Sequence, residues 1–233
     1  MRRALATLSV GLLCACASAP PAPSAGRSTA WGYLKLVPRE GVAAVVEGPH
    51  AYGDRRLAGT ELVDYSKPGF AVVFADDTES ERGRVALAIR STAAGLRLEP
   101  ADAALGVGGE LVVQNQSGEA RVVSVPSGGV VRRLAPGGSL TLAVATPGEW
   151  PVFLLDAPGE QALVFAAPGR YAVVSETGRF ALPDLPPGRR RLHAWHPRFP
   201  SASSWVELAP GRLARVDFEL RVDRRDDGVA GAP

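Results

Sequence analysis

Few side chains in this sequence could serve as metal ligands, bases or nucleophiles. The chain has two Cys and three His, and its one Met is at position 1. His193 and His196 lie three residues apart in a stretch that we expect to be a β-strand, and His50 is the third imidazole. An odd offset in a strand directs two side chains to opposite faces, so one metal ion cannot easily bind both. We therefore predict neither a metal site nor a cofactor.

Arginines and a tryptophan alternate with apolar residues around these imidazoles. One face of the expected strand carries Arg189, Arg191, His193 and Trp195, and the other carries Arg190, Leu192, Ala194 and His196. Leu192 and Ala194 mark the second face as the core face, so we expect His196 to be an inward, hydrogen-bonded structural residue. The first face is the candidate partner-binding site, because guanidinium and indole groups bind anionic or aromatic partners through cation–π and bidentate contacts. The alternative is that Trp195 packs against a neighbouring sandwich and the arginines are only solvated.

Other catalytic or ligand-binding arrangements have little support. The acidic run at 76–81 lacks the Gly and the ligand spacing of a calcium loop, and we interpret it as a solvated hairpin. The sequence has no G-x-S-x-G nucleophile motif. A dispersed Ser-His-Asp triad is an alternative that no local motif supports. We predict that the protein is not an enzyme.

Both cysteines lie in a segment typical of a secretory signal. A short basic segment precedes an apolar run at 4–13, and small residues follow it. The run is too short for a transmembrane helix, which needs roughly 20 residues. The ending Leu-x-Ala-Cys, with Leu13 and Ala15 before Cys16, resembles the lipobox of bacterial lipoproteins, whereas Cys14 does not fit that pattern.

This resemblance implies that Cys16 is acylated, becomes the new N-terminus and anchors the chain. The next residue is Ala rather than Asp, which implies sorting to the outer membrane, facing the periplasm. We predict a signal peptide at 1–15 and a flexible tether rich in Pro, Ala and Ser at 16–29. The alternative is an ordinary cleaved signal that contains two Cys. With Cys14 removed and Cys16 acylated, the mature chain cannot form a disulfide.

Composition limits the classes of fold and partner. The formal net charge is +2 and 21% of residues are charged, which gives no reason to expect a nucleic-acid partner. Hydrophobic residues make up 46% of the chain, enough for stability to come from burial. A mature chain of roughly 220 residues suits one large β domain or two small ones.

From residue 31 onward, short apolar runs alternate with Gly, Pro, Asp and Ser, the pattern of strands and turns. The predicted strands are at 31–37, 42–47, 60–65, 69–75, 82–90, 109–115, 119–125, 129–133, 139–145, 149–155, 161–166, 170–175, 178–182, 190–196, 203–208 and 212–220. Alternation places Val85, Leu87 and Ile89 on one face. We also predict one turn of helix at 101–105 and a disordered tail at 223–233.

Pro-Gly pairs punctuate the second half of the chain. They begin at residues 136, 147, 158, 168, 187 and 210. Each pair favours a type II turn, because Pro presets φ at the first central position and Gly accepts positive φ at the second. The first four recur about every ten to eleven residues, a spacing typical of an antiparallel sandwich or barrel and not of βαβ units.

Two stretches together resemble a bacterial periplasmic family of proteins related to methylamine-utilisation proteins. The first contains LEP at 98–100 and GELVVQN at 109–115, and the second contains GRFALPDLPPG at 178–188 and LHAWH at 192–196. In that family a plastocyanin-like (cupredoxin) domain precedes a carboxypeptidase-regulatory-like, transthyretin-like domain. The resemblance implies an all-β fold, with an antiparallel Greek-key sandwich at 30–166 followed by a small transthyretin-like sandwich at 167–222.

The copper ligands of that family are not present in this chain. The resemblance places a His ligand at the position of Arg121, and the remaining Cys, His and Met ligands between Trp150 and Phe165, where this chain has none of the three. A blue-copper site needs a thiolate, two imidazoles and usually an axial thioether. The mature chain has no free Cys and no Met, so we expect the metal site to be absent.

We therefore expect a lipid-anchored envelope protein that acts as a non-catalytic binding or scaffolding module. Its expected partners are the membrane, through the lipid on Cys16, and an envelope protein or glycan. One alternative is a periplasmic carrier of metal or electrons, related to plastocyanin-like proteins. A second alternative is a carbohydrate-binding β-sandwich with an exposed aromatic platform.

Overall fold

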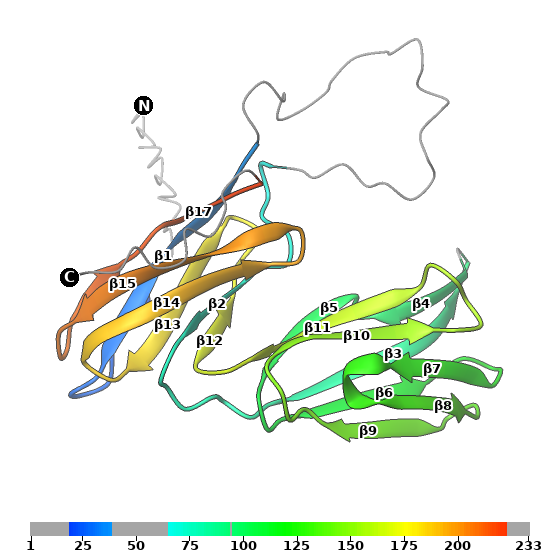
Figure 1. The fold of residues 1–233 in the computed structure, drawn as a ribbon. Coiled ribbons are helices and arrows are strands. Elements are labelled where there is room, and N and C mark those ends of the chain that lie inside the picture. The colour runs from blue at the N-terminus through cyan, green and yellow to red at the C-terminus, as the bar shows by residue number, and fades with distance from the viewer. Residues whose placement is uncertain (1–18, 39–64, 94, 223–233) are drawn as a thin grey trace, which may run out of the picture.

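The computed structural model describes residues 19–38, 65–93 and 95–222, and almost all of its regular structure is β-strand (Figure 1). The predicted all-β sandwich fold is confirmed. Cys16, the signal segment, the predicted strand at 42–47, all but the last residue of that at 60–65, and the tail at 223–233 lie outside the described residues. Among the described residues, no helix is long and apolar enough to span a membrane.

The first sandwich consists of nine strands in two sheets. One sheet has the order β4-β3-β6-β9 and the other has the order β5-β11-β10-β7-β8. The strands are β3 (Arg84–Thr92), β4 (Gly95–Glu99), β5 (Asp102–Gly106), β6 (Glu110–Asn115), β7 (Arg121–Val125), β8 (Val130–Leu134), β9 (Ser139–Ala143), β10 (Gly148–Leu154) and β11 (Gln161–Ala167). A single 3₁₀ turn, η2 (Pro126–Gly128), joins β7 to β8.

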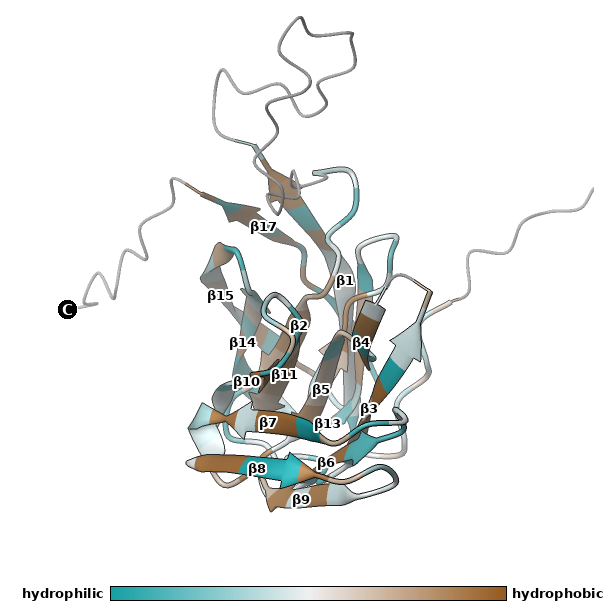
Figure 2. Cartoon of the chain, turned by 90° about the vertical axis from the view of Figure 1, so that its right-hand side faces the viewer, coloured by the Kyte–Doolittle hydropathy of each residue, from teal (hydrophilic) through white to brown (hydrophobic). Residues whose placement is uncertain are grey.

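Alternation along these strands separates core from surface, as expected. Leu87 and Ile89 on β3 are fully buried, and Val85 packs against the same core. Figure 2 shows apolar residues concentrated on β11 inside its sheet, whereas β8 at the sheet edge changes from apolar to polar along its length. The two sheets therefore bury one face each against the other.

The helical turn predicted at 101–105 is wrong, because this segment forms strand β5. Ala103 and Leu105 lie opposite Val164 and Ala166 of β11 in a parallel pairing. Ala-rich sequence has a low intrinsic preference for strands, but pairing with a buried neighbouring strand overrides that preference. Strand β4 was also absent from the predicted set.

The second sandwich is assembled from segments at both ends of the described chain. One sheet has the order β13-β1-β16, with β17 also paired to β1, and the other has the order β12-β2-β14-β15. The strands are β1 (Ser28–Val37), β2 (Val72–Ala75), β12 (Tyr171–Val173), β13 (Arg179–Leu185), β14 (Gly188–His196), β15 (Phe199–Leu208), β16 (Leu213–Arg215) and β17 (Phe218–Arg221).

The first sandwich is thus inserted between β2 and β12 of the second (Figure 1). The range 30–166 expected for the first sandwich includes β1 and β2, yet every strand that pairs with them belongs to the second sandwich. The segments that form each sandwich therefore differ from the ranges 30–166 and 167–222.

A glycine in β1 allows the two halves of one sheet to meet. A Cβ at Gly32 would lie 1.8 Å from the backbone oxygen of Val216, at the break between β16 and β17. On either side of this break, β1 pairs in parallel with β16 and then with β17. Only glycine permits this close approach of two backbones.

The Pro-Gly pairs behave largely as predicted. Positive φ is found at five of the six glycines: Gly137, Gly148, Gly159, Gly188 and Gly211. The sixth, Gly169, serves close packing instead, because a Cβ there would lie 2.1 Å from the backbone oxygen of Ala75.

Candidate functional site

Strand β14 lies between β2 and β15, and its two faces have the predicted composition. Leu192 and Ala194 are fully buried in the core of the second sandwich, and His196 is 6% exposed on the same side. The opposite side carries the candidate partner-binding residues, which are Arg189, Arg191, His193 and Trp195. The structure gives these four residues three different environments.

His196 is a structural residue, as predicted. Its Nε2 lies 3.0 Å from the carbonyl oxygen of Pro68, and its Nδ1 accepts a hydrogen bond of 3.0 Å from the backbone N–H of Arg198. Burial lowers the pKa of His196 to about 4, and this outweighs the raising effect of the bond to Pro68. The imidazole is therefore neutral at pH 7 and donates from Nε2.

Trp195 lies between the two sandwiches. Its ring stacks on Phe165 of β11, with centroids 4.1 Å apart and planes at 24°. Phe70 meets the same ring edge-on at 5.8 Å. These residues belong to a small third apolar cluster that also contains Phe74 and Tyr171 and is separate from both sandwich cores. Of the two roles considered for Trp195, packing against the neighbouring sandwich is the one that this arrangement provides.

His193 is held against strand β2. Its ring stacks on Phe74 at 5.0 Å and 11°, and its Nε2 lies 2.7 Å from a carboxylate oxygen of Asp76. The segment expected to be a solvated hairpin instead connects β2 to β3, leading from one sandwich to the other. Its first carboxylate, Asp76, therefore fixes His193 beside this crossing.

Asp76 and His193 raise the question of a hydrolytic triad, because Ser203 lies directly opposite His193 on β15. The Ser203 hydroxyl accepts hydrogen bonds of 2.9 and 3.2 Å from Arg191. No hydrogen bond joins Ser203 to His193 in the described structure. The contact between nucleophile and base that an activated serine needs is therefore not formed.

Arg189 and Arg191 lie on an exposed surface that continues onto β15. We call it the β14–β15 face, and it comprises Arg189, Arg191, Ser203, Trp205 and Glu207. Trp205 is 57% exposed, and the guanidinium carbon of Arg189 lies 4.7 Å from the centroid of its ring. Trp205 was not predicted as a site residue. Alternation within β15 identifies it, since Val206 and Leu208 on either side of Glu207 point inward.

This face has groups that can bind a partner. Arg189 forms no ion pair with any described residue, so its donors remain available. A guanidinium binds carboxylates or phosphates in a bidentate manner, and stacking on an indole holds its plane in place. The exposed surface of Trp205 adds an apolar contact area beside this anion-binding group.

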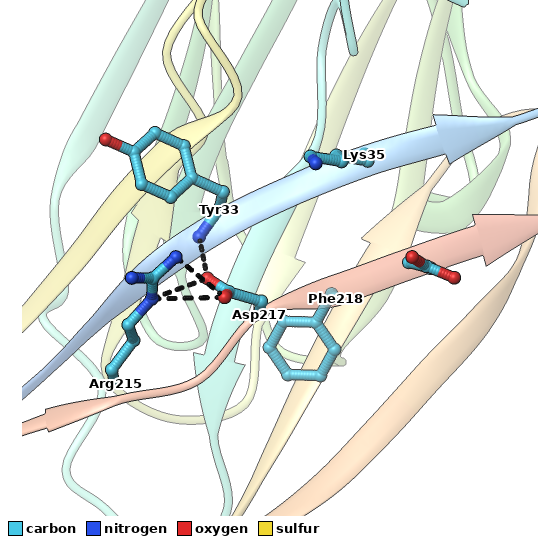
Figure 3. Close-up of a pocket in the computed structure, with 6 residues that line it drawn as sticks. Tyr33, Lys35, Arg215, Asp217 and Phe218 are labelled. Atoms are coloured by element: carbon cyan, nitrogen blue, oxygen red, sulfur yellow. Dashed lines mark hydrogen bonds and ion pairs between the residues drawn. The ribbon is translucent and has the colours of Figure 1, made fainter.

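A groove between β1 and β17 is a second candidate (Figure 3). It has a volume of about 400 Å³, and its lining includes Tyr33, Lys35, Arg215 and Asp217. Asp217 accepts a hydrogen bond of 2.9 Å from the Tyr33 backbone N–H and forms an ion pair of 3.0 Å with Arg215. The guanidinium of Arg215 in turn covers the rings of Trp31 and Tyr33, at 5.3 and 5.9 Å. These groups stabilise the break in the sheet, which leaves fewer of them available to a ligand.

The residues at and near Arg121, where the resemblance implies a copper ligand, form a network of ion pairs. Arg121, whose side chain is 14% exposed, lies 2.9 Å from Glu119 and 3.2 Å from Asp156. Burial raises the pKa of Asp156, but hydrogen bonds from the Val122 N–H and from Arg121 lower it further, so the net direction is down and the carboxylate is charged. Buried Asn115 and Ser117 complete the network, with the Ser117 hydroxyl accepting from Arg121.

These residues do not fit a blue-copper centre. Carboxylates and a guanidinium replace the required thiolate and imidazoles, and the guanidinium occupies the position of the first expected ligand. Across residues 19–38, 65–93 and 95–222, no group of three or more His, Cys, Asp and Glu side chains is placed to hold a metal ion.

No protein-family model matches the chain, and no curated protein sequence matches it. Among solved structures, the purple cupredoxin from Nitrosopumilus maritimus matches at 17% identity and a TM-score of 0.31, over 36% of this chain and 99% of its own. Auracyanin from Roseiflexus castenholzii matches at 14% identity and a TM-score of 0.30, over 38% of this chain and 99% of its own. Pseudoazurin from Hyphomicrobium denitrificans matches at 13% identity and a TM-score of 0.30, over 36% of this chain and 74% of its own. Scores this low carry no inference about ligand or activity.

Proposed function

We propose that this chain is a lipid-anchored protein of the bacterial envelope that acts as a non-catalytic binding module. The lipobox-like residues that end at Cys16 support the anchor, and the Pro- and Ser-containing segment after it supports a tether. The binding surface is the β14–β15 face, and its partner carries carboxylate or phosphate groups.

One observation carries this proposal: the guanidinium of Arg189 lies 4.7 Å over the exposed ring of Trp205. Trp and Arg are enriched among the few interface residues that supply most of the binding energy, and truncating such a hot-spot residue costs about 2 kcal/mol or more. Arg191 lies opposite Trp205 in the strand pairing and adds a second cation to the same patch.

The alternative of a metal or electron carrier has less support, because an arginine and carboxylates occupy the position of the expected ligands. Metal analysis of the purified mature protein tests it directly. Stoichiometric copper or zinc would support the carrier and contradict the binding module.

Two experiments test the proposal. A Cys16→Ala variant should lose fatty-acid labelling and leave the membrane fraction, and unchanged labelling would rule out this anchor site. For the binding face, a photoreactive amino acid at position 207, opposite Arg189, should form a discrete adduct in intact envelopes.

Removing Arg189 and Arg191 together should reduce that adduct by about tenfold or more, since 1.4 kcal/mol corresponds to a factor of ten. The matched control is the removal of Arg132 and Arg133, an exposed pair on β8 of the other sandwich, and it should leave the adduct unchanged. An adduct that survives the first double variant, or that is lost equally in the second, would contradict the assignment of this face. The size and composition of the adduct distinguish a protein partner from a glycan.

A further inference from the structure

The end of the predicted tether is attached to the second sandwich. The backbone N–H of Ser24 donates at 2.8 Å to the carboxylate of Asp184, which lies near the end of β13. The carbonyl of Arg27 accepts from the Gly211 N–H at 2.7 Å, and the Ser28 hydroxyl donates to the Ala209 carbonyl at 2.7 Å. Residues 24–28 are thus held by the end of β13 and by the β15–β16 turn.

The backbone at this attachment point has an uncommon conformation. Asp184 has φ of 56°, and Asp77 has φ of 53°; among the described residues, they are the two non-glycine residues with positive φ. Both line one polar cavity of about 400 Å³, together with Ser24, Arg27 and Arg170. Non-glycine residues with positive φ are uncommon, and they cluster where the surrounding structure requires a particular backbone geometry.

Electrostatics favour the same contact. The hydrogen bonds from Ser24 lower the pKa of Asp184, and nearby Arg170 and Arg27 add to that effect. The carboxylate is therefore charged at neutral pH, and a charged acceptor strengthens its hydrogen bond to the Ser24 N–H. The tether is therefore attached to the sandwich by a charge-assisted hydrogen bond.

Chain length then limits where the bilayer can lie. Ser24 follows Cys16 by eight residues. Eight fully extended residues span at most about 29 Å, and a Pro-rich segment such as this one, with Pro20, Pro21 and Pro23, spans about 25 Å. A lipid on Cys16 therefore keeps the attachment point within about 30 Å of the lipid surface.

We propose that the end of the second sandwich formed by the β13–β14 and β15–β16 turns faces the lipid headgroup surface, with the attached tether acting as a short strap. This inference rests on the proposed acylation of Cys16. The loop between β6 and β7, in the first sandwich, lies at the opposite end of the molecule from the β15–β16 turn (Figure 1). The strap directs that loop away from the membrane.

The lipidated full-length protein, reconstituted into phospholipid vesicles, allows a direct test. Acylation leaves no free thiol on the mature chain, so one added cysteine takes one fluorescent label. Ala209→Cys labels the strapped end, where Ala209 is exposed. Gly118→Cys labels the far loop, where a Cβ would meet no atom within 4 Å. The strap limits the distance between the label at position 209 and the lipid surface. Energy transfer to a headgroup acceptor should therefore be at least about twofold more efficient for Ala209→Cys than for Gly118→Cys.

Asp184→Gly removes the carboxylate that holds Ser24 and keeps a residue suited to positive φ. It should reduce the difference between the two transfer efficiencies, because it lengthens the free tether, while the hydrogen bonds of Arg27 and Ser28 to the β15–β16 turn remain. Asp77→Gly is the matched control, because Asp77 lines the same cavity without a hydrogen bond to Ser24, and it should preserve the difference.

Equal transfer from the two labels in the otherwise unchanged, vesicle-bound protein would overturn the proposed orientation. A difference as large in Asp184→Gly as in the unaltered protein would overturn the role of the Ser24–Asp184 contact in the strap. If instead the protein does not attach to vesicles, or a Cys16→Ala variant attaches equally well, the proposed anchor itself fails.

Discussion

The contact between the two sandwiches can be tested at Phe165. This residue lies on β11 of the first sandwich, where its neighbours Val164 and Ala166 point into the core of that sandwich. Phe165 points outward and is 4% exposed, because it stacks on Trp195 at 4.1 Å and meets Phe74 at 5.8 Å. A Phe165→Ala substitution therefore removes packing between the sandwiches without opening either core.

The free-energy cost of Phe165→Ala follows from the burial of the side chain and from its ring contacts. Truncation of a buried Phe to Ala costs about 3–5 kcal/mol. Of this, the two ring pairs made by Phe165 account for about 0.5–1.5 kcal/mol each beyond their buried area. Since the loss falls on the contact between the sandwiches, the equilibrium constant for their docking should decrease by about two to four powers of ten.

Scanning calorimetry measures this coupling. The unaltered protein should unfold in one transition with equal van't Hoff and calorimetric enthalpies, whereas Phe165→Ala should show two transitions. Phe153→Ala on β10 is the matched control, since Phe153 is only half-buried and lies outside the third cluster. A single transition at the original midpoint in Phe165→Ala, or equal uncoupling by Phe153→Ala, would refute this account of the interface.

Three further substitutions test other parts of the structure. Gly32→Ala places a Cβ 1.8 Å from the Val216 oxygen, and urea unfolding should show a loss of about 3 kcal/mol or more. His196 has a pKa of about 4, below its ordinary value, so its contribution to the stability of the fold is complete above pH 6.5 and declines as the pH falls toward 4. Thermal unfolding should therefore show a free energy of unfolding that is about 2–3 kcal/mol lower at pH 4.5 than at pH 7. In His196→Gln this difference between the two pH values should disappear. Asn115→Ala deprives three backbone carbonyls of a buried amide donor, and should lower the free energy of unfolding of the first sandwich by about 3 kcal/mol in urea titrations.

Local patterns in the sequence predict much of this fold. The alternation along β14 identifies Leu192 and Ala194 as core and His196 as a buried structural residue, because neighbouring residues alone determine which face of a strand is apolar. The Pro-Gly pairs mark turns for the same reason, since the conformational limits of Pro and Gly are intrinsic. The segment at 101–105 shows where this reasoning fails, because its strand is stabilised by β11, about 60 residues later in the chain.

Long-range pairing could not be predicted from such patterns. Trp31 of β1 lies opposite Ala181 on one side and Arg215 on the other, and nothing in residues 28–37 specifies partners so far along the chain. The same limit applies to the candidate site. Sequence periodicity places Trp195 on the outward face of β14, but only the packing of the inserted sandwich shows that this ring meets Phe165.

The arrangement assigns different mechanical roles to the two sandwiches. The proposed binding face and the attached tether both belong to the second sandwich, and β14 follows shortly after β13, the strand that carries Asp184. A force between partner and membrane would therefore pass through one sandwich and would not cross the interface at Phe165. The first sandwich is joined by two chain crossings, from β2 to β3 and from β11 to β12, and by the aromatic contact. Two crossings restrict rotation more than a single linker does, so loss of the aromatic contact should loosen the first sandwich while leaving the proposed anchoring and the proposed partner binding intact.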